Sequence, residues 1–306
     1  MSNTYKSFAI VGAGDIGTHV VNAFVSIGLH PVVLSRKSSS QPKNLPSSVT
    51  VAKVEGYDAV DEVAGVFKEY NVEVVISTIG SSALEVEYAL ADAAKKAGVK
   101  LFVPSEFGFV TEGVSKVSND KDSVLIWKDK FAEHIREMGL PFARFFVGSF
   151  FGYVPWITAY EENGKVNIYG KGDQYVSFTD EADIAGTSFP PYLYECITNP
   201  VVVIGYVAYV LTTQPPKELD NRCFRIEGDK TTMVELAKRL KKEIEYVDRV
   251  PGEPLNDLKN WLARLWDGGK GSTSWDYQLG ARRDKNDNEL WPNHTWKTFA
   301  DIGLSL

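Results

Sequence analysis

The chain has few of the residues that build disulfide frameworks and metal clusters. Its 306 residues include only two cysteines, Cys196 and Cys223, and four histidines. Two cysteines make neither a disulfide framework nor a zinc cluster, and a chain of this length can bury a core without such cross-links. We therefore expect a reduced protein with one large domain or two modest ones.

The sequence also lacks a long apolar run and an excess of positive charge. No run is long enough to span a bilayer, and the polar residues directly after Met1 do not form a signal peptide. The formal net charge is -7, which disfavours binding to nucleic acid and to anionic membranes. We expect a cytoplasmic protein whose partner is a small-molecule substrate, and the sequence leaves its oligomeric state open.

A glycine-rich turn lies close to the N-terminus. An apolar run ending at Val11 leads into a G-x-G-x-x-G motif, and an amphipathic helix closed by Gly28 follows. The glycines let the turn tighten and let the backbone approach a pyrophosphate at the helix N-terminus. A dinucleotide site requires a strand before the motif and a helix after it, and both are predicted here. The alternative, a glycine turn that binds nothing, does not require this context. The predicted cofactor-binding residues of this turn are Gly12, Gly14, Asp15, Ile16 and Gly17.

The second predicted strand ends in Ser35, Arg36 and Lys37. A site that prefers NAD usually has an acidic residue at this place, where it holds the ribose 2′-hydroxyl. Here the place holds Ser35, and the two cations after it suit a 2′-phosphate. The sequence therefore predicts NADP(H) as the cofactor. An alternative is that Arg36 and Lys37 are ordinary surface cations.

Strands and helices alternate along the first half of the chain. Strands are predicted over 49–53, 72–78, 99–103 and 142–147, and helices over 61–70, 84–97 and 123–138. This alternation predicts an α/β fold, a Rossmann-type doubly wound parallel sheet covered on both faces. Ligands of such sheets bind beyond the carboxyl ends of the strands. That rule adds further predicted cofactor-binding residues: Thr78, Ile79, Gly80, Ser105 and Phe107.

The second half is less regular. Short strands are predicted over 165–169, 176–178 and 223–226, and helices over 232–244, capped by Thr231, and 255–266. We therefore expect an NADP(H)-binding domain over 1–154 and a smaller α+β substrate-binding region over 155–306. Its tryptophan, tyrosine and phenylalanine content suits an aromatic guest, although aromatic side chains more often build a core.

Lys128 interrupts the apolar face of the helix predicted over 123–138. Its neighbours at helical spacing are all apolar: Val124, Phe131, Ala132 and Ile135. Lys130 lies instead on a charged, solvated face. A lysine on the core-facing stripe has a lowered pKa and can act as a general base or donor near neutral pH. The alternative is a lysine whose stem covers apolar surface while its amine reaches water.

The helix carries no Tyr-x-x-x-Lys, the catalytic pair of common short-chain dehydrogenases, although Ser105 stands where such an enzyme keeps its serine. The chain resembles instead the isoflavone reductase-like, NmrA-like group of atypical short-chain dehydrogenases, in particular its fungal branch. The segments that carry the resemblance are 12–17, 103–108, the helix around Lys128, 139–142, 150–153, 170–173, 178–180 and 224–229.

This resemblance implies an NADPH-dependent reductase of small, often aromatic molecules, with Lys128 as the catalytic lysine. It also implies that Arg36 and Lys43 hold the 2′-phosphate. NADPH would give its hydride to a carbonyl or an activated double bond, with Lys128 as the acid or base. The alternative is an NADP(H)-sensing regulatory protein without turnover, because NmrA-like members include such sensors.

The sequence departs from the plant members of this group in several places. Its glycine loop is one residue shorter, and Gly148 stands where the plant enzymes have asparagine. An additional segment, 186–205, interrupts the family pattern and carries prolines that would break a helix. This insertion is either a retained intron in the gene model or a genuine surface loop, and sequencing of the mature transcript distinguishes the two.

Overall fold

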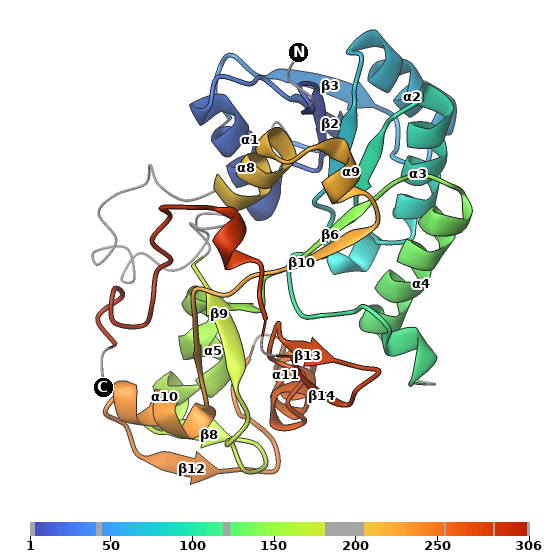
Figure 1. The fold of residues 1–306 in the computed structure, drawn as a ribbon. Coiled ribbons are helices and arrows are strands. Elements are labelled where there is room, and N and C mark those ends of the chain that lie inside the picture. The colour runs from blue at the N-terminus through green and yellow to red at the C-terminus, as the bar shows by residue number, and fades with distance from the viewer. Residues whose placement is uncertain are drawn as a thin grey trace.

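A five-stranded parallel sheet forms the N-terminal part of the molecule (Figure 1). The computed structural model describes residues 4–40, 45–118, 123–180, 205–253, 255–283 and 285–304. The strands are β1 (Phe8–Val11), β2 (Val32–Arg36), β3 (Thr50–Val54), β4 (Val74–Ser77) and β5 (Leu101–Val103). Their order is β3-β2-β1-β4-β5, so the chain reverses direction across the sheet between β1 and β4, where doubly wound sheets bind ligands. The predicted Rossmann-type fold is confirmed.

Helices cover both faces of this sheet because strand side chains alternate between the two faces. The helices are α1 (Asp15–Ser26), α2 (Val60–Glu69), α3 (Val86–Ala97), α4 (Val124–Glu137) and α8 (Gly205–Thr213). Phe8 and Ile10 of β1 share a hydrophobic core with α1 and α8. Ala9 and Val11 share a second core with α2, α3 and α4. Figure 1 shows these three helices on the opposite side of the sheet from α1 and α8. β1 is buried along its whole length, as expected for a parallel strand.

The chain returns to the sheet after residue 154. β6 (Ala143–Phe146) borders β5 through the amide of Phe102, which donates to the Pro141 carbonyl at 2.8 Å. β10 (Arg222–Arg225) then pairs with β6 in parallel, with Phe224 opposite Phe145. The division of the chain at residue 154 stays a prediction, but α8 and β10, from beyond that point, pack with the N-terminal sheet.

The C-terminal part contains smaller sheets. β7 (Ser149–Phe150), β9 (Val176–Thr179) and β11 (Asp229–Thr231) form one, β8 (Val166–Ile168) and β12 (Ile244–Tyr246) a second, and β13 (Trp275–Asp276) and β14 (Ala281–Arg282) a third. The helices here are α5 (Val154–Thr158), α6 (Tyr160–Asn163), α10 (Met233–Arg239) and α11 (Asn256–Asp267). The short helix α9 (Pro216–Leu219) lies instead beside the N-terminal sheet, where Leu219 joins the core that contains α1 and α8. Phe178, Trp266 and Phe299 pack in a hydrophobic core to which β8, β9, α5, α10 and α11 contribute. The predicted smaller C-terminal region is confirmed.

The helix predicted over 232–244 is shorter than expected. α10 ends at Arg239, and its cap is Thr232 rather than Thr231. The Thr232 hydroxyl accepts the Glu235 amide at 3.1 Å, and the Glu235 carboxylate accepts the Thr232 amide, which is a complete capping box. Lys241 has a positive φ of +54°, which ends the helical course, and the following residues pair with β8 as β12.

Some of the sequence predictions lie outside the described residues: Lys43, Cys196 and residues 186–204 of the predicted insertion. Gly205, at the end of that insertion, is the first residue of α8. Across the ranges that the structure covers, no helix combines the length and the apolar character needed to span a membrane.

Candidate functional site

The glycine turn between β1 and α1 has the geometry of a phosphate cradle. Gly12 has a φ of +91°, and a Cβ at Gly17 would collide with the Gly12 carbonyl oxygen and with Thr78 Oγ1. Thr78 Oγ1 itself donates to that carbonyl at 2.6 Å. A Cβ at Gly14 would meet no atom within 4 Å, and no side chain caps the N-terminus of α1, which Asp15 and Ile16 begin. The turn therefore fits a pyrophosphate: tight packing requires Gly17, and Gly14 leaves open space at a helix N-terminus.

A pocket of about 310 Å³ opens beside the end of β2. Arg36 lines it, with its guanidinium carbon 5.8 Å from the centre of the Tyr57 ring. Ile79, Ala83 and Val86 provide an apolar wall on the β4 side. A cation beside an aromatic ring and an apolar wall is the combination that an adenine nucleotide with a ribose phosphate needs.

The other cations at this edge already have partners. Lys37 Nζ lies 2.5 Å from a Glu55 carboxylate oxygen and 3.3 Å from one of Glu62. The hydrogen bond to Glu55 raises the pKa of Lys37. Lys37 would have to leave these carboxylates to reach a phosphate, and its role as a cofactor residue stays a prediction.

Lys53 is a cation at this edge that sequence reasoning missed. Its amine donates to Ser35 Oγ at 3.1 Å, to the Arg36 carbonyl at 3.3 Å and to the Ser39 carbonyl at 3.2 Å. It therefore holds the turn that presents Arg36. The signal was available in part, because Lys53 lies directly opposite Ser35 once the parallel register of β2 and β3 is known.

The loops after β4 and β5 meet at the same edge. Ser105 Oγ donates to the Ile79 carbonyl at 2.8 Å, which ties the two loops together. Gly80 caps the short 3-10 helix Ser81–Ala83, so it continues the same loop. Phe107 has a φ of +37°, its amide donates to the Phe145 carbonyl at 3.1 Å, and its side chain is buried in the core that contains α1 and α8. The structure thus brings the predicted strand-end residues to one edge of the sheet.

Lys128 on α4 reaches the turn after β5. Its side chain is partly buried, and its amine donates to the Glu106 carbonyl at 3.1 Å. Burial lowers the pKa of Lys128, and the carboxylates of Glu106 and Glu87 oppose this effect. Lys130 is exposed, as expected. Lys128 is the lysine of the pair that reaches the carboxyl edge of the sheet.

A buried ionic cluster supports this turn. Arg144 Nε lies 2.8 Å from a Glu106 carboxylate oxygen, and Arg144 Nη1 lies 3.3 Å from an Asp129 carboxylate oxygen. These side chains are at most 2% exposed. Asp129 also accepts the amides of Gly113 and Ser115 at 3.1 and 3.0 Å. Because Asp129 follows Lys128 on α4, the cluster holds this part of the helix against the turn.

Glu87 is a second feature that sequence reasoning missed. It lies in the first turn of α3, is 1% exposed, and accepts the Ser105 amide at 2.9 Å. Burial raises its pKa to about 7, against the opposing effects of Ser77, the Ser105 amide and Lys128. Among the described residues the buried Ser77 hydroxyl has no hydrogen-bond partner, so the Ser105 amide is the donor that binds Glu87.

A sequence signal for Glu87 existed in the spacing of α3. Leu90, Ala91 and Ala94 follow it by three, four and seven residues, and all are buried. Glu87 therefore stands on the apolar face of its helix, as Lys128 does on α4.

Gly148 has no room for a side chain. Its φ is +75°, and a Cβ there would collide with the Ser177 carbonyl oxygen. The backbone conformation of this chain therefore requires glycine at this position.

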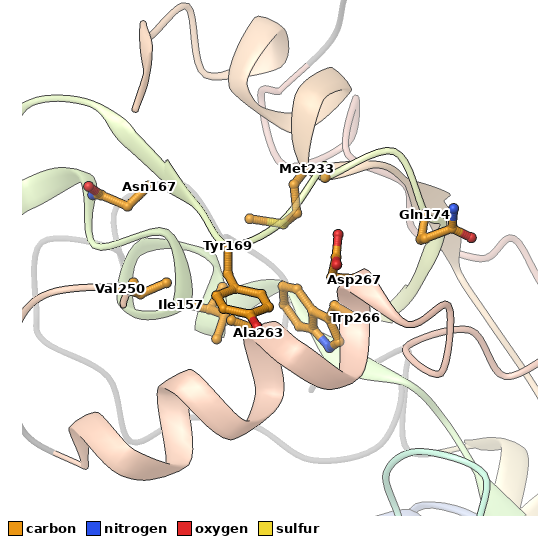
Figure 2. Close-up of a pocket in the computed structure, with 10 residues that line it drawn as sticks. Ile157, Asn167, Tyr169, Gln174, Met233, Val250, Ala263, Trp266 and Asp267 are labelled. Carbon is orange, nitrogen blue, oxygen red and sulfur yellow. The ribbon is translucent and has the colours of Figure 1, made fainter. Parts of the chain in front are cut away.

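The cavity drawn in Figure 2 lies in the C-terminal part and is small. Its volume is about 10 Å³, which is room for about one water molecule. Tyr169, Met233 and Trp266 surround it, and its lining residues come from neither the parallel sheet nor the loops at its carboxyl edge. It does not hold an aromatic guest, and the prediction that the second half supplies the substrate pocket stays a prediction.

Sequence comparison identifies relatives along most of the chain. A sequence model described as the NmrA-like family matches residues 4–260. The oxidoreductase aprR of Aspergillus flavus is 34% identical over 150 residues, which cover 48% of this chain and 49% of aprR. The phenylcoumaran benzylic ether reductase PT1 of Pinus taeda is 33% identical over 199 residues, which cover 60% of this chain and 63% of PT1. The chain thus spans about half to under two thirds of the length of these curated relatives.

Solved structures share the fold. The complex of leucoanthocyanidin reductase from Vitis vinifera with NADPH superposes with a TM-score of 0.66 and 18% sequence identity. The match covers 98% of this chain and 100% of the other. At this identity the likeness concerns the fold alone, and it includes both the parallel sheet and the smaller C-terminal sheets.

Proposed function

The chain belongs to the NmrA-like family, and on that premise we propose that it is an NADPH-dependent reductase of a small molecule. Its substrate is a carbonyl compound or an activated alkene, and Lys128 acts as the acid or base. The observation that carries the proposal is the position of Lys128. Its amine is held by the Glu106 carbonyl at the edge of the sheet where the glycine turn also lies.

The cofactor residues of the proposal follow from their geometry. The turn over 12–17 would hold the pyrophosphate, and Arg36 would hold the 2′-phosphate, with the adenine beside Tyr57 in the adjacent pocket. NADPH, when bound, supplies a hydride to the substrate. The complex of leucoanthocyanidin reductase with NADPH supports this assignment by fold.

Lys128 would complete the reduction as a proton donor. Reduction of a carbonyl places a hydride on carbon and leaves negative charge on oxygen, which then takes a proton. The ammonium group of Lys128 stabilises this charge and gives up its proton, so the amine ends neutral. For an activated alkene, the same ammonium stabilises and protonates the enolate. Burial lowers the pKa of Lys128 and so makes it a better acid than a solvated lysine.

The names of relatives support an aromatic substrate class. Phenylcoumaran benzylic ether reductase PT1 is named for an aromatic ether. A screen of NADPH oxidation over aromatic aldehydes, enones and quinones tests this class directly. We expect turnover with at least one of them and faster turnover with NADPH than with NADH.

The decisive variant is Lys128→Ala. We expect it to lower kcat roughly 100-fold to 10,000-fold, because general acid–base catalysis supplies about that factor. NADPH affinity, measured by quenching of tryptophan fluorescence, stays nearly unchanged. Lys130→Ala is the matched control on the exposed face of the same helix and leaves kcat unchanged. Full activity of Lys128→Ala on an identified substrate would refute the mechanism.

The alternative is an NADP(H)-sensing regulatory protein without turnover. The glycine turn and the pocket beside Arg36 are compatible with it, because they would hold the cofactor whether or not a substrate reacts. The sensor would be established by three results from a folded sample. The sample binds NADPH, it does not oxidise NADPH in the presence of any compound of the screen, and it captures a partner protein in only one redox state of the cofactor.

A further inference from the structure

Glu87 is a buried carboxylate that the proposed reaction does not use. It is 1% exposed and lies in the first turn of α3, where the helix dipole favours a negative charge. Burial of a carboxylate without a compensating partner costs free energy. The contacts of Glu87 must therefore offset the free-energy cost of its burial.

The turn after β5 joins Glu87 to Lys128. The Ser105 amide donates to the Glu87 carboxylate at 2.9 Å, and the carbonyl of the next residue, Glu106, accepts the Lys128 amine at 3.1 Å. Ser105 Oγ fixes the same turn to the Ile79 carbonyl at 2.8 Å. The carboxylate and the amine therefore bind one two-residue stretch of backbone, each through a separate peptide group.

The charged groups that face Lys128 come from three elements. Glu87 belongs to α3, Glu106 to the turn after β5, and Arg144 to β6. Glu106 is already paired with Arg144 at 2.8 Å and accepts the Thr111 hydroxyl at 3.0 Å. Glu87 forms no direct ion pair with another residue of the described ranges, and it faces Ser77, Ser105, Glu106 and Lys128. Of the two carboxylates that face Lys128, Glu106 is therefore neutralised by Arg144, whereas Glu87 is not.

We propose that Glu87 is the positioning residue for Lys128: its carboxylate fixes the turn that receives the Lys128 amine and keeps that amine protonated. Its importance for catalysis rests on the proposed reductase function, whereas the electrostatic coupling itself does not. In the low-dielectric interior, a carboxylate acts on a nearby ammonium without direct contact.

The titration of the two groups agrees with this arrangement. Burial lowers the pKa of Lys128, and Glu106 and Glu87 raise it. The pKa of Glu87 is about 7, so Glu87 gains its charge as the pH rises through neutrality. Above that pH, the new charge opposes loss of the proton from Lys128.

The test is a direct titration of Lys128 in the full chain without substrate. Trace acetylation with acetic anhydride at a series of pH values, read by peptide mass spectrometry, gives the pH midpoint at which the Lys128 amine becomes reactive. Glu87→Gln keeps the size of the side chain and an oxygen that accepts the Ser105 amide, but removes the charge. We expect this variant to lower the Lys128 midpoint by about one pH unit, while Lys130 in the same samples does not change.

Two further variants separate charge from structure. Glu85→Gln removes an exposed carboxylate two residues earlier on the same segment and leaves the Lys128 midpoint where it is. Glu87→Asp keeps the charge and holds the midpoint closer to that of the unsubstituted protein than Glu87→Gln does. An unchanged Lys128 midpoint in Glu87→Gln, or an equal shift in Glu85→Gln, overturns the proposal.

The kinetic counterpart distinguishes this inference from the proposed function. If the chain is a reductase, the alkaline limb of its kcat–pH profile moves to lower pH in Glu87→Gln, with the KM for NADPH unchanged. A shifted Lys128 midpoint in a protein that turns over no substrate supports the coupling and contradicts the reductase function. Turnover that depends on Lys128, together with an unshifted Lys128 midpoint in Glu87→Gln, supports the reductase function and contradicts the coupling.

Discussion

The end of β2 and the turn after β5 both carry charge at the same edge of the sheet, but in opposite environments. At β2 the Lys37 and Glu55 side chains are 48% and 72% exposed, and Arg36 borders an open pocket. At the turn after β5 the Arg144 and Glu106 side chains are 2% and 1% exposed. Water and salt screen the first group, so its charges contribute little to folding, and the proposed contact of Arg36 with the cofactor would cost little stability. The second group is desolvated, so its charges affect stability and proton affinity together.

The largest effect is expected from Arg144→Met. This change leaves Glu106 and Asp129 buried without their cation, and breaking a buried pair from one side costs about 3–5 kcal/mol of unfolding free energy. Urea unfolding measures the loss. Lys96→Met removes one partner of the exposed pair with Asp61 and is the control, because its unfolding midpoint stays nearly constant. Equal losses in the two variants would break the contrast between buried and exposed charge.

The next effect is the pH dependence of stability through Glu87. Its pKa is about 7 in the folded protein against a model value of 4.5, so the folded state holds this proton more tightly than the unfolded state does. The stability that this group contributes is present in acid and is lost as the pH rises from 4.5 through 7, by up to about 3 kcal/mol. Glu87→Gln removes this loss. In urea unfolding, the free energy of unfolding of the variant should therefore rise relative to that of the unsubstituted protein as the pH increases from acid to alkaline. Parallel pH profiles of the two proteins would contradict this prediction.

At the exposed end, Arg36→Ala tests cofactor preference. A charge-assisted contact to the 2′-phosphate predicts a Kd for NADPH that rises roughly tenfold or more, whereas the Kd for NADH changes little. Quenching of tryptophan fluorescence measures both constants. Added salt weakens NADPH binding in the unsubstituted protein more than in the variant. Equal loss of affinity for both cofactors would show that Arg36 does not contact the 2′-phosphate.

The smallest effect is expected from Lys37→Ala. Glu55 and Glu62 already hold the Lys37 amine, so its removal changes the Kd for NADPH less than the removal of Arg36 does. The same fluorescence titration decides the order of the two variants. A larger loss with Lys37→Ala would mean that this lysine leaves its carboxylates when the cofactor binds.

The fold of the first half could be predicted because its information is local. The apolar strand into the glycine turn and the apolar face of the helix over 123–138 are written in consecutive residues, and β1, α1 and α4 follow them closely. The second half was harder because its short elements depend on partners distant in the chain. α10 ends five residues before its predicted end, because the chain beyond it forms β12, which pairs with β8.

The candidate site divides in the same way. Gly17, Arg36 and Lys128 could be named from spacing, because the motif, the strand end and the helical face each mark one residue. Lys53 and Arg144 could not, since each acts through a residue from another element: Ser35 and Glu106. The spacing of α3 marks Glu87 as a charge on an apolar face, but it does not reveal the contact with the Ser105 amide. Such partners are defined by parallel register and by crossover helices, and neither leaves a short-range signal.

Local sequence patterns were sufficient to predict the class of sheet, the glycine turn at its carboxyl edge and a lysine on an apolar helix face. These follow from periodicity and from the backbone freedom of glycine, which act over a few residues. Which charges are solvated and which are buried depends on the packing of the folded chain. That packing paired Lys37 with Glu55, placed Arg144 between Glu106 and Asp129, and brought Glu87 and Lys128 to the same turn. Desolvation of a charged group depends on the atoms that pack around it, and those atoms come from segments far apart in the chain.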